Sequence, residues 1–361
     1  MHDAAGGEPG KNRQAAPEEE ENQMSAKHLL HVTAAALITL GFSINADAAE
    51  KISIMVGGLE KIIYLPAKLA EQLGYFKAEG LDVELLSEPA GVDAENEMLA
   101  GAVQGVVGFY DHSIDLQAKG KYVESVVQFS QAPGEVELVS AKLADQIKSP
   151  ADFKGRNLGV TGLGSSTNFL TQFLAVKNGV QLGEFTSVPV GAGNTFIAAL
   201  QQAKIDAGMT TEPTISRLLK TGEAKILIDM RSADTTRQAL GGLYPAACLY
   251  MEVGWVEQHK EETQKLANAF VKTLRYIASH SADEIAAQMP KDYYVGDKDL
   301  YVNALATGKQ MFTADGKMPA DGPPTVLQVL ATFDKSVKGK TIDLSKTYTT
   351  TFVDAVKVET N

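Results

Sequence analysis

Two successive runs of alternating strand and helix signals constrain the fold of this chain most strongly. The first run has strand signals at 51–57, 81–86, 105–110 and 123–129, with helix signals at 66–73 and 94–99. The second run has strand signals at 135–140, 156–161, 185–190, 207–210 and 224–230, with helix signals at 168–178, 194–202 and 214–220. This alternation predicts an α/β fold in which each run builds a parallel or mixed sheet covered by helices.

The last third of the chain is mostly helical. A strand signal at 244–251 precedes helix signals at 257–279, 282–288, 298–310 and 325–335. We therefore expect two α/β lobes, with crossings between them near 133–136 and 243–247. The expected boundaries are 49–134 plus 245–361 for lobe 1 and 135–244 for lobe 2. Because ligands of open α/β sheets bind beyond the carboxyl ends of the strands, we expect a ligand cleft between the lobes.

The first 48 residues have the pattern of an export signal. The segment 29–44 is apolar and uncharged, Lys27 precedes it, and Ala46-Asp47-Ala48 forms a small-residue cleavage site. The apolar segment is shorter than the roughly 18–20 residues of a membrane span, although a permanent anchor is the alternative. The acidic segment 1–23 is unsuited to a signal peptide, so we expect it to be disordered or a misassigned start. The pattern predicts a periplasmic protein.

Composition excludes several functional classes. The formal net charge is −12 and no block of basic residues occurs, so nucleic acid is not an expected partner. The single cysteine, Cys248, excludes an internal disulfide and a cysteine-cluster metal site. No HExxH motif, G-x-S-x-G motif or Cys–His pair is present, so we expect no catalytic residues, no metal site and no cofactor. We expect a monomer.

Several phrases of the sequence resemble a known family. They are GGLEKIIYLPAKLAEQLGYFKAEGLDVEL from Gly57, GFYD from Gly108, SPADFKG from Ser149, GLGSST from Gly162 and DAGMTTEP from Asp206. In this order they resemble the nitrate, sulfonate and taurine branch of ABC-importer binding proteins, which also includes proteins like the thiamine-pyrimidine synthases. The resemblance covers about 50–280. It implies a type II periplasmic-binding-protein fold, a hinge-closing cleft, a small-molecule ligand, and delivery to a membrane permease with its ATPase.

The turn from Gly162 to Thr167 is the strongest candidate ligand site. It follows a strand and opens a helix, and it contains Gly164, Ser165, Ser166 and Thr167. Free backbone N–H groups, hydroxyls and the positive end of a helix dipole would together hold an anion. Ordinary helix capping by one hydroxyl is the alternative. The turn also partly matches the dinucleotide fingerprint, but Thr167 replaces its third glycine, so a nucleotide site is rejected.

The other candidate ligand-binding residues follow predicted strands. Glu212 would receive an amino or N–H group of the ligand, or would complement a helix dipole. Asp111 would accept a hydrogen bond from the ligand, or would be a helix N-cap. The remaining candidates line the expected cleft and are Gly58, Glu60, Tyr64, Tyr110, His112 and Asn194. Lys61 would neutralise an anion, but we expect it to be a solvated surface lysine.

Three functions are consistent with these residues. The leading hypothesis is a binding protein for a small organic anion, such as a sulfonate or carboxylate. The second is a binding protein for a pyrimidine or another nitrogen-rich precursor, held by Glu212 and Asp111. The third is an exported enzyme on the same fold.

Overall fold

The computed structural model describes residues 51–294 and 296–357. The described residues belong to one compact unit, Ala48–Asn361. The predicted leader and signal peptide, residues 1–48, lie outside the described residues. Among the described residues, no helix combines the length and apolarity needed to cross a membrane.

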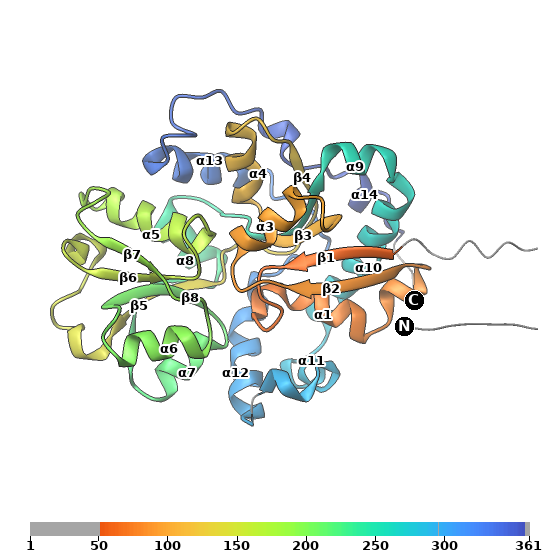
Figure 1. Ribbon diagram of the computed structural model, residues 1–361. Helices are drawn as coiled ribbons and strands as arrows, with labels where there is room; N and C mark the ends of the chain where they lie inside the picture. Colours follow the sequence, from red (N-terminus) through yellow and green to blue (C-terminus); the bar gives the residue numbers. More distant parts are fainter. Residues whose placement is uncertain (1–50, 295, 358–361) are drawn as a thin grey trace, which may run out of the picture. The chain divides into compact units, whose positions relative to one another are not determined.

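The first sheet has five strands in the order β2-β1-β3-β10-β4 (Figure 1). They are β1 (Lys51–Val56), β2 (Asp82–Ser87), β3 (Gly105–Phe109), β4 (Val123–Gln128) and β10 (Ala247–Glu252). Strands β1, β2 and β3 are parallel, whereas β10 runs antiparallel to β3 and β4. The helices from this part of the chain are α1 (Leu65–Gln72), α2 (Tyr75–Ala78), α3 (Gly91–Leu99) and α4 (Asp111–Ala118).

The second sheet has five strands in the order β7-β6-β8-β5-β9. They are β5 (Glu135–Ser140), β6 (Asn157–Val160), β7 (Thr186–Pro189), β8 (Ala207–Thr211) and β9 (Ala224–Met230). Strand β5 runs antiparallel to β8 and β9. The helices of this part are α5 (Ser166–Lys177), α6 (Asn194–Gln201), α7 (Thr214–Lys220) and α8 (Ala233–Leu240).

The two sheets have the same topology. In the first sheet the antiparallel strand β10 lies between β3 and β4, and in the second sheet the antiparallel strand β5 lies between β8 and β9. Each of these is the first strand after the chain passes from one sheet to the other, because β5 follows β4 and β10 follows β9. The predicted α/β fold with two sheets is confirmed. Two chain segments join the sheets, one between β4 and β5 and one between β9 and β10.

The C-terminal segment is helical, as expected. It comprises α9 (Val253–Gln258), α10 (Lys260–Ser279), α11 (Ala282–Gln288), α12 (Lys298–Gly308), α13 (Gly322–Phe333) and α14 (Thr351–Asp354). The single helix predicted over 257–279 is wrong in one respect, because His259 interrupts it with φ −124° and ψ 49°. The strand predicted to start at 244 begins at Ala247. Helices α2 and α8 were not predicted.

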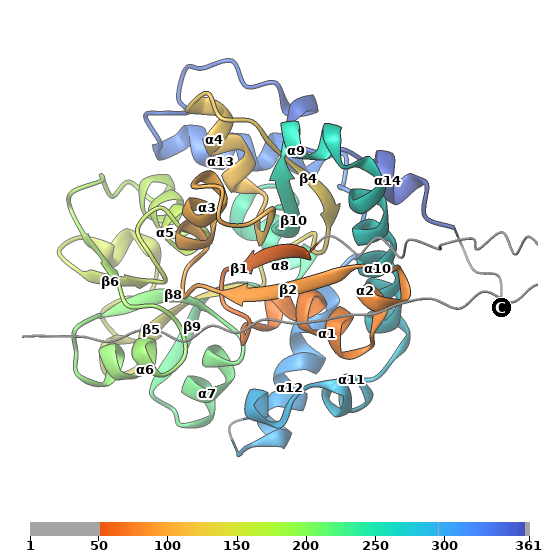
Figure 2. The ribbon, with the colours of Figure 1, turned by 45° about the vertical axis from the view of Figure 1, so that its right-hand side comes forward.

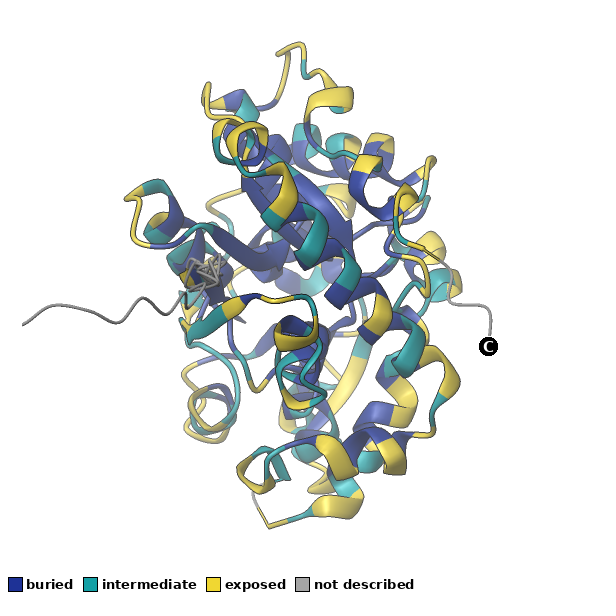
Figure 3. Cartoon of the chain, turned by 90° about the vertical axis from the view of Figure 1, so that its right-hand side faces the viewer, coloured by how far each residue is buried: buried dark blue, intermediate teal, exposed yellow. Residues whose placement is uncertain are grey.

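The main hydrophobic core extends from the first sheet into α5. Phe169, Leu170, Phe173 and Leu174 of α5 belong to the same buried cluster as strands β1 and β3. The ring of Phe169 lies 5.9 Å from that of Phe333 in α13. Figure 2 shows helices packed around the sheets. Figure 3 shows that buried residues lie mainly in the inner strands and that exposed residues lie mainly on the outer helix faces and loops. Apolar packing therefore fixes α5 against lobe 1 and determines where its N-terminus points.

Candidate functional site

Loops at the ends of four strands surround a small enclosed space that we call the inner chamber. Its lining residues come from the ends of β1, β6 and β8, the start of β5 and the start of α3: Lys61, Ile63, Tyr64, Gly91, Glu135, Thr161, Ser165, Ser166, Thr167 and Thr211. Its volume is about 10 Å³, which is room for about one water molecule. A ligand larger than a water molecule does not fit this space as it stands.

The N-termini of α3 and α5 face each other across this space. Ser165 is the N-cap residue of α5, but its side chain does not cap that helix. Ser165 Oγ instead accepts a 3.3 Å hydrogen bond from the backbone N–H of Val92, in the first turn of α3. Both helices have the positive ends of their dipoles here. The arrangement favours negative charge between the lobes.

Asp111 places a carboxyl group at the start of α5 from within the protein. Its Oδ1 accepts a 2.9 Å hydrogen bond from Ser166 Oγ, and its Oδ2 accepts a 2.8 Å bond from the Tyr244 hydroxyl. Asp111 is fully buried, and burial raises the pKa of its carboxyl. The N-cap role considered for Asp111 is wrong, because α4 begins at Asp111 itself, after Tyr110. Its carboxylate joins the two lobes and the second crossing segment.

The other residues of the predicted turn make local bonds. Thr167 Oγ1 accepts from the backbone N–H of Thr161 at 3.0 Å and lies 2.9 Å from the Thr161 hydroxyl. Gly164 has φ +88° and donates its N–H to Asn168 Oδ1 at 3.1 Å. The hydroxyls of Ser165, Ser166 and Thr167 therefore all take part in hydrogen bonds within the protein.

Lys61 contradicts the expectation of a solvated surface lysine. Its residue is 4% exposed, and Nζ donates to the carbonyls of Gly57 at 2.5 Å and Pro89 at 2.8 Å. Burial lowers the pKa of Lys61 to about 8. Gly58, with φ +116°, forms the turn beneath it, and a Cβ there would lie 2.6 Å from Lys61 Cε. The positive φ is what requires glycine at this turn.

Glu135 is a chamber residue that the sequence did not reveal. It lies at the start of β5, it is 2% exposed, and its Oε2 has no hydrogen-bond partner among the described residues. Burial, followed by repulsion from Asp111, raises its pKa well above the usual range for a glutamate. Burial therefore disfavours the charged form of the Glu135 carboxyl. The only sequence signal was the presence of two acidic side chains, Glu135 and Glu137, in the short strand EVELVS.

The predicted aromatic residues lie at different places. Tyr64 lines the inner chamber, and its ring packs edge-on against Phe109 at 6.2 Å. Tyr110 points away from the chamber, because its hydroxyl forms a hydrogen bond with Thr347 in the C-terminal segment. The structure thus gives Tyr64, and not Tyr110, a place in the cleft.

His112 lies behind the chamber in a buried ion pair. Its Nδ1 is 2.5 Å from Glu95 Oε2, and its ring lies 6.0 Å from that of Phe169 in α5. Burial lowers the pKa of His112, but Glu95, Asp111 and Asp115 together outweigh burial and raise it to about 9. The imidazole is therefore positively charged at neutral pH.

Glu212 and Asn194 make contacts within lobe 2. Glu212 Oε1 accepts from Arg231 at 2.9 Å, and its Oε2 accepts from the backbone N–H of Ser216 at 2.9 Å. Asn194 Oδ1 accepts from Arg217 at 2.7 Å on the surface. Of the two roles weighed for Glu212, these contacts favour the structural one.

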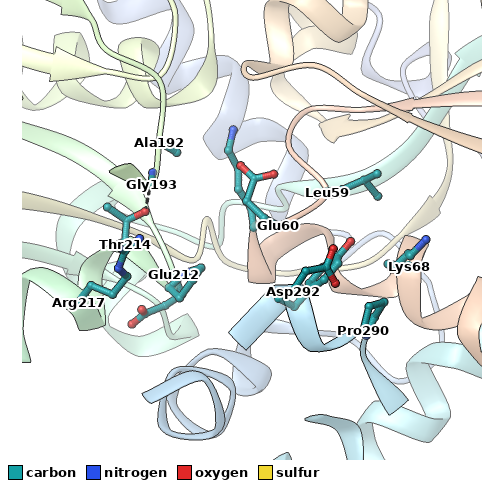
Figure 4. A pocket seen from close by; sticks show the side chains of 13 residues that line it. Leu59, Glu60, Lys68, Ala192, Gly193, Glu212, Thr214, Arg217, Pro290 and Asp292 are labelled. Carbon is teal, nitrogen blue, oxygen red and sulfur yellow. Dashed lines mark hydrogen bonds between the residues drawn. The ribbon is translucent and has the colours of Figure 1, made fainter. Parts of the chain in front are cut away.

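A larger cavity, which we call the outer cavity, lies beside the inner chamber. Its volume is about 520 Å³ (Figure 4). Its walls come from the turn after β1, the starts of α6 and α7, and the segment after α11: Leu59, Glu60, Lys61, Lys68, Ala192, Gly193, Glu212, Pro213, Thr214, Arg217, Pro290, Asp292 and Tyr293. Lys61 lines both spaces and separates them. Within 51–294 and 296–357, no group of three or more metal-ligating side chains is present.

Comparisons with known proteins agree with this fold. The model of the NMT1/THI5-like family matches residues 64–284. A structure from Bordetella bronchiseptica RB50 is 36% identical, with a TM-score of 0.80, over 84% of this chain and 96% of that one. The alkanesulfonate-binding protein SsuA from Xanthomonas axonopodis pv. citri, bound to MOPS, is 15% identical, with a TM-score of 0.66, over 83% of this chain and 98% of that one.

One curated relative is named as an enzyme. The 4-amino-5-hydroxymethyl-2-methylpyrimidine phosphate synthase THI13 of Saccharomyces cerevisiae is 26% identical over 168 residues. The match covers 46% of this chain and 47% of the yeast protein. The chain thus spans about half the length of this relative.

Proposed function

The chain belongs to the NMT1/THI5-like family, and from this premise we propose that it is the periplasmic solute-binding component of an ABC importer. It captures a small organic anion, such as a sulfonate or carboxylate, between its lobes and passes it to a membrane permease with its ATPase. It acts as a monomer and performs no reaction on the ligand. Its export depends on the signal peptide expected within residues 1–48.

One observation carries the choice of an anion. The N-termini of α3 and α5 converge on the inner chamber together with the Lys61 ammonium group. Helix N-termini and a buried cation stabilise negative charge without further partners. The protein itself already places one carboxylate, that of Asp111, against Ser166 at the start of α5. A ligand anion would find the same donors once the lobes open.

Capture by closure follows from how the lobes are joined. Two chain segments connect the sheets, and polar contacts such as Ser165 with Val92 cross the chamber, whereas α5 packs against lobe 1 through apolar side chains. Opening at the chamber therefore breaks hydrogen bonds that water or a ligand can replace, and it also changes the apolar contact of α5 with lobe 1. The ligand adds contacts to both lobes in the closed form, and these contacts shift the population toward closure.

A second ligand class is favoured by the buried carboxyl groups. Glu135 lines the inner chamber and Asp111 is bonded to Ser166 of its lining, and a nitrogen-rich ligand would donate N–H groups to these carboxyl groups. A pyrimidine is one such ligand, and the name of the yeast relative refers to a pyrimidine. The anion is preferred because the starts of two helices and Lys61 line the chamber, while burial disfavours the charged form of the Glu135 carboxyl.

The test is a binding screen of the purified protein against methanesulfonate, butanesulfonate, acetate, nitrate and 4-aminopyrimidine. A ligand at 100 times its dissociation constant stabilises the folded state by about 2.7 kcal/mol, which thermal unfolding detects. Stabilisation by the anions supports the proposal, and stabilisation by 4-aminopyrimidine alone supports the second class. Chemical conversion of a bound compound, followed by mass spectrometry, would instead indicate an enzyme.

A further inference from the structure

Gly91 occupies a position where a side chain would change the site. It is the first residue of α3 and it lines the inner chamber. An atom at its Cβ position would lie 3.1 Å from His112 Nε2 and 4.0 Å from the Tyr64 hydroxyl. Its φ is not positive, so backbone conformation does not require glycine here. The absence of a side chain is therefore a matter of space.

The group behind Gly91 lacks a hydrogen-bond partner. His112 is 1% exposed, and its Nε2 has no partner among the described residues. Burying such a group without a partner costs free energy, so its retention needs a reason. Glu95 contacts the other ring nitrogen at 2.5 Å and thereby fixes the orientation of the ring. The His112 ring also packs against Phe169 of lobe 2, so this part of lobe 1 becomes accessible when the lobes separate.

We infer that Gly91 is a specificity-determining residue. Because it has no side chain, His112 Nε2 and the Tyr64 hydroxyl are available as paired donors for one small acceptor atom of the ligand. This inference rests on the proposed function. The acceptor is one oxygen of a compact oxyanion, whose other oxygens face the start of α5 and Lys61. The positive charge of His112, which follows from its raised pKa of about 9, strengthens a hydrogen bond to such an oxygen.

A side chain at residue 91 closes this space. An added methyl group would lie in close contact with His112 Nε2, so a ligand oxygen could no longer reach that nitrogen. The effect is steric and local. A ligand held only by lobe 2 and Lys61 would not respond to the change.

The experiment compares Gly91→Ala with Gly254→Ala. A Cβ at Gly254, in α9, has no atom within 4 Å, so this control adds the same methyl group in open space. Methanesulfonate binding is measured by calorimetry on the purified protein, with circular dichroism and thermal unfolding of each variant. We expect at least a tenfold weaker binding for Gly91→Ala and a change of less than twofold for Gly254→Ala. His112→Gln, which retains an N–H donor, should bind more tightly than His112→Phe.

The outcomes separate the inference from the proposed function. If Gly91→Ala and His112→Phe are both folded and bind methanesulfonate as tightly as the wild type, the inference is overturned and the proposed function stands. If the wild type binds 4-aminopyrimidine and not methanesulfonate, the anion assignment fails. The same variants then test the inference with that probe, because a ring nitrogen is also an acceptor. If neither compound binds the wild type, the anion assignment and the inference are both overturned.

Discussion

Ser166 Oγ and Asp111 Oδ1 are 2.9 Å apart and belong to different lobes. The hydroxyl starts α5, and the carboxylate starts α4. The same carboxylate accepts from Tyr244, in the second crossing segment. One buried acid therefore links residues from both lobes to the second crossing segment.

Removing the Ser166 hydroxyl should weaken closure. Ser166→Ala leaves the Asp111 carboxylate with one donor fewer, and we expect the free energy of unfolding to fall by about 1–3 kcal/mol. Tyr244→Phe removes the other donor to Asp111 by deleting a single hydroxyl group. Denaturant unfolding measures both effects, and fluorescence energy transfer between labels on α6 and α11 measures the lobe separation. Unchanged stability and separation in Ser166→Ala would show that this bond does not hold the lobes together.

Anion affinity should depend on pH mainly through Lys61. Burial lowers the pKa of Lys61 to about 8, so its charge is present below pH 8 and is lost above it. We expect the affinity for methanesulfonate to fall by about tenfold between pH 7 and pH 9. Lys61→Met should bind weakly at both pH values and should keep only the smaller dependence that comes from His112, whose pKa is about 9. Equal pH dependence in the wild type and in Lys61→Met would exclude Lys61 as its source.

Glu137 should make the protein less stable as pH rises. It is fully buried in β5, and burial raises its pKa from 4.5 to about 8. The folded state thus retains a proton that the unfolded state loses, so the stabilisation is complete below pH 4.5 and is lost between pH 4.5 and 8. Glu137→Gln imitates the protonated form and can still accept from Thr171. The free energy of unfolding of Glu137→Gln should exceed that of the wild type by roughly 5 kcal/mol at pH 8 and should equal it at pH 4, as measured by urea unfolding.

Arg231 should matter for stability more than for ligand binding. Arg231→Ala leaves Glu212, which is 2% exposed, without its ionic partner. Breaking a buried pair in this way costs about 3–5 kcal/mol. Thermal unfolding checks the stability, and calorimetry at a temperature where the variant is folded checks binding. A loss of methanesulfonate affinity greater than tenfold would contradict the structural role of Glu212.

The fold was predictable because local patterns determine most of its elements. Strands β5 and β9 and helix α7 begin and end where the sequence predicted, since apolar runs flanked by Pro, Gly or Thr mark them. Helix α8, with the sequence ADTTRQAL, was missed because it is short and its polar residues outnumber its apolar ones. Its capping box at Ser232 was the signal that could have revealed it.

The site was only partly predictable, because its contacts join distant residues. The turn at Gly162–Thr167 was recognised from glycines and hydroxyls, but the partner of Ser166 lies 55 residues away. The burial of Lys61 depends on the Pro89 carbonyl, 28 residues away. Glu135 and the space beside Gly91 become meaningful only once the lobes are assembled. Sequence reasoning located the strand ends, and the packing of α5 against lobe 1 decided which side chains meet there.

The most direct test of the account is calorimetric titration of the wild type and of Ser166→Ala/Thr167→Ala with methanesulfonate at pH 7. The account predicts saturable binding at one site by the wild type, and a loss of about 1–3 kcal/mol in binding free energy for the folded double variant. Binding of equal strength by both proteins would contradict an anion site at the start of α5.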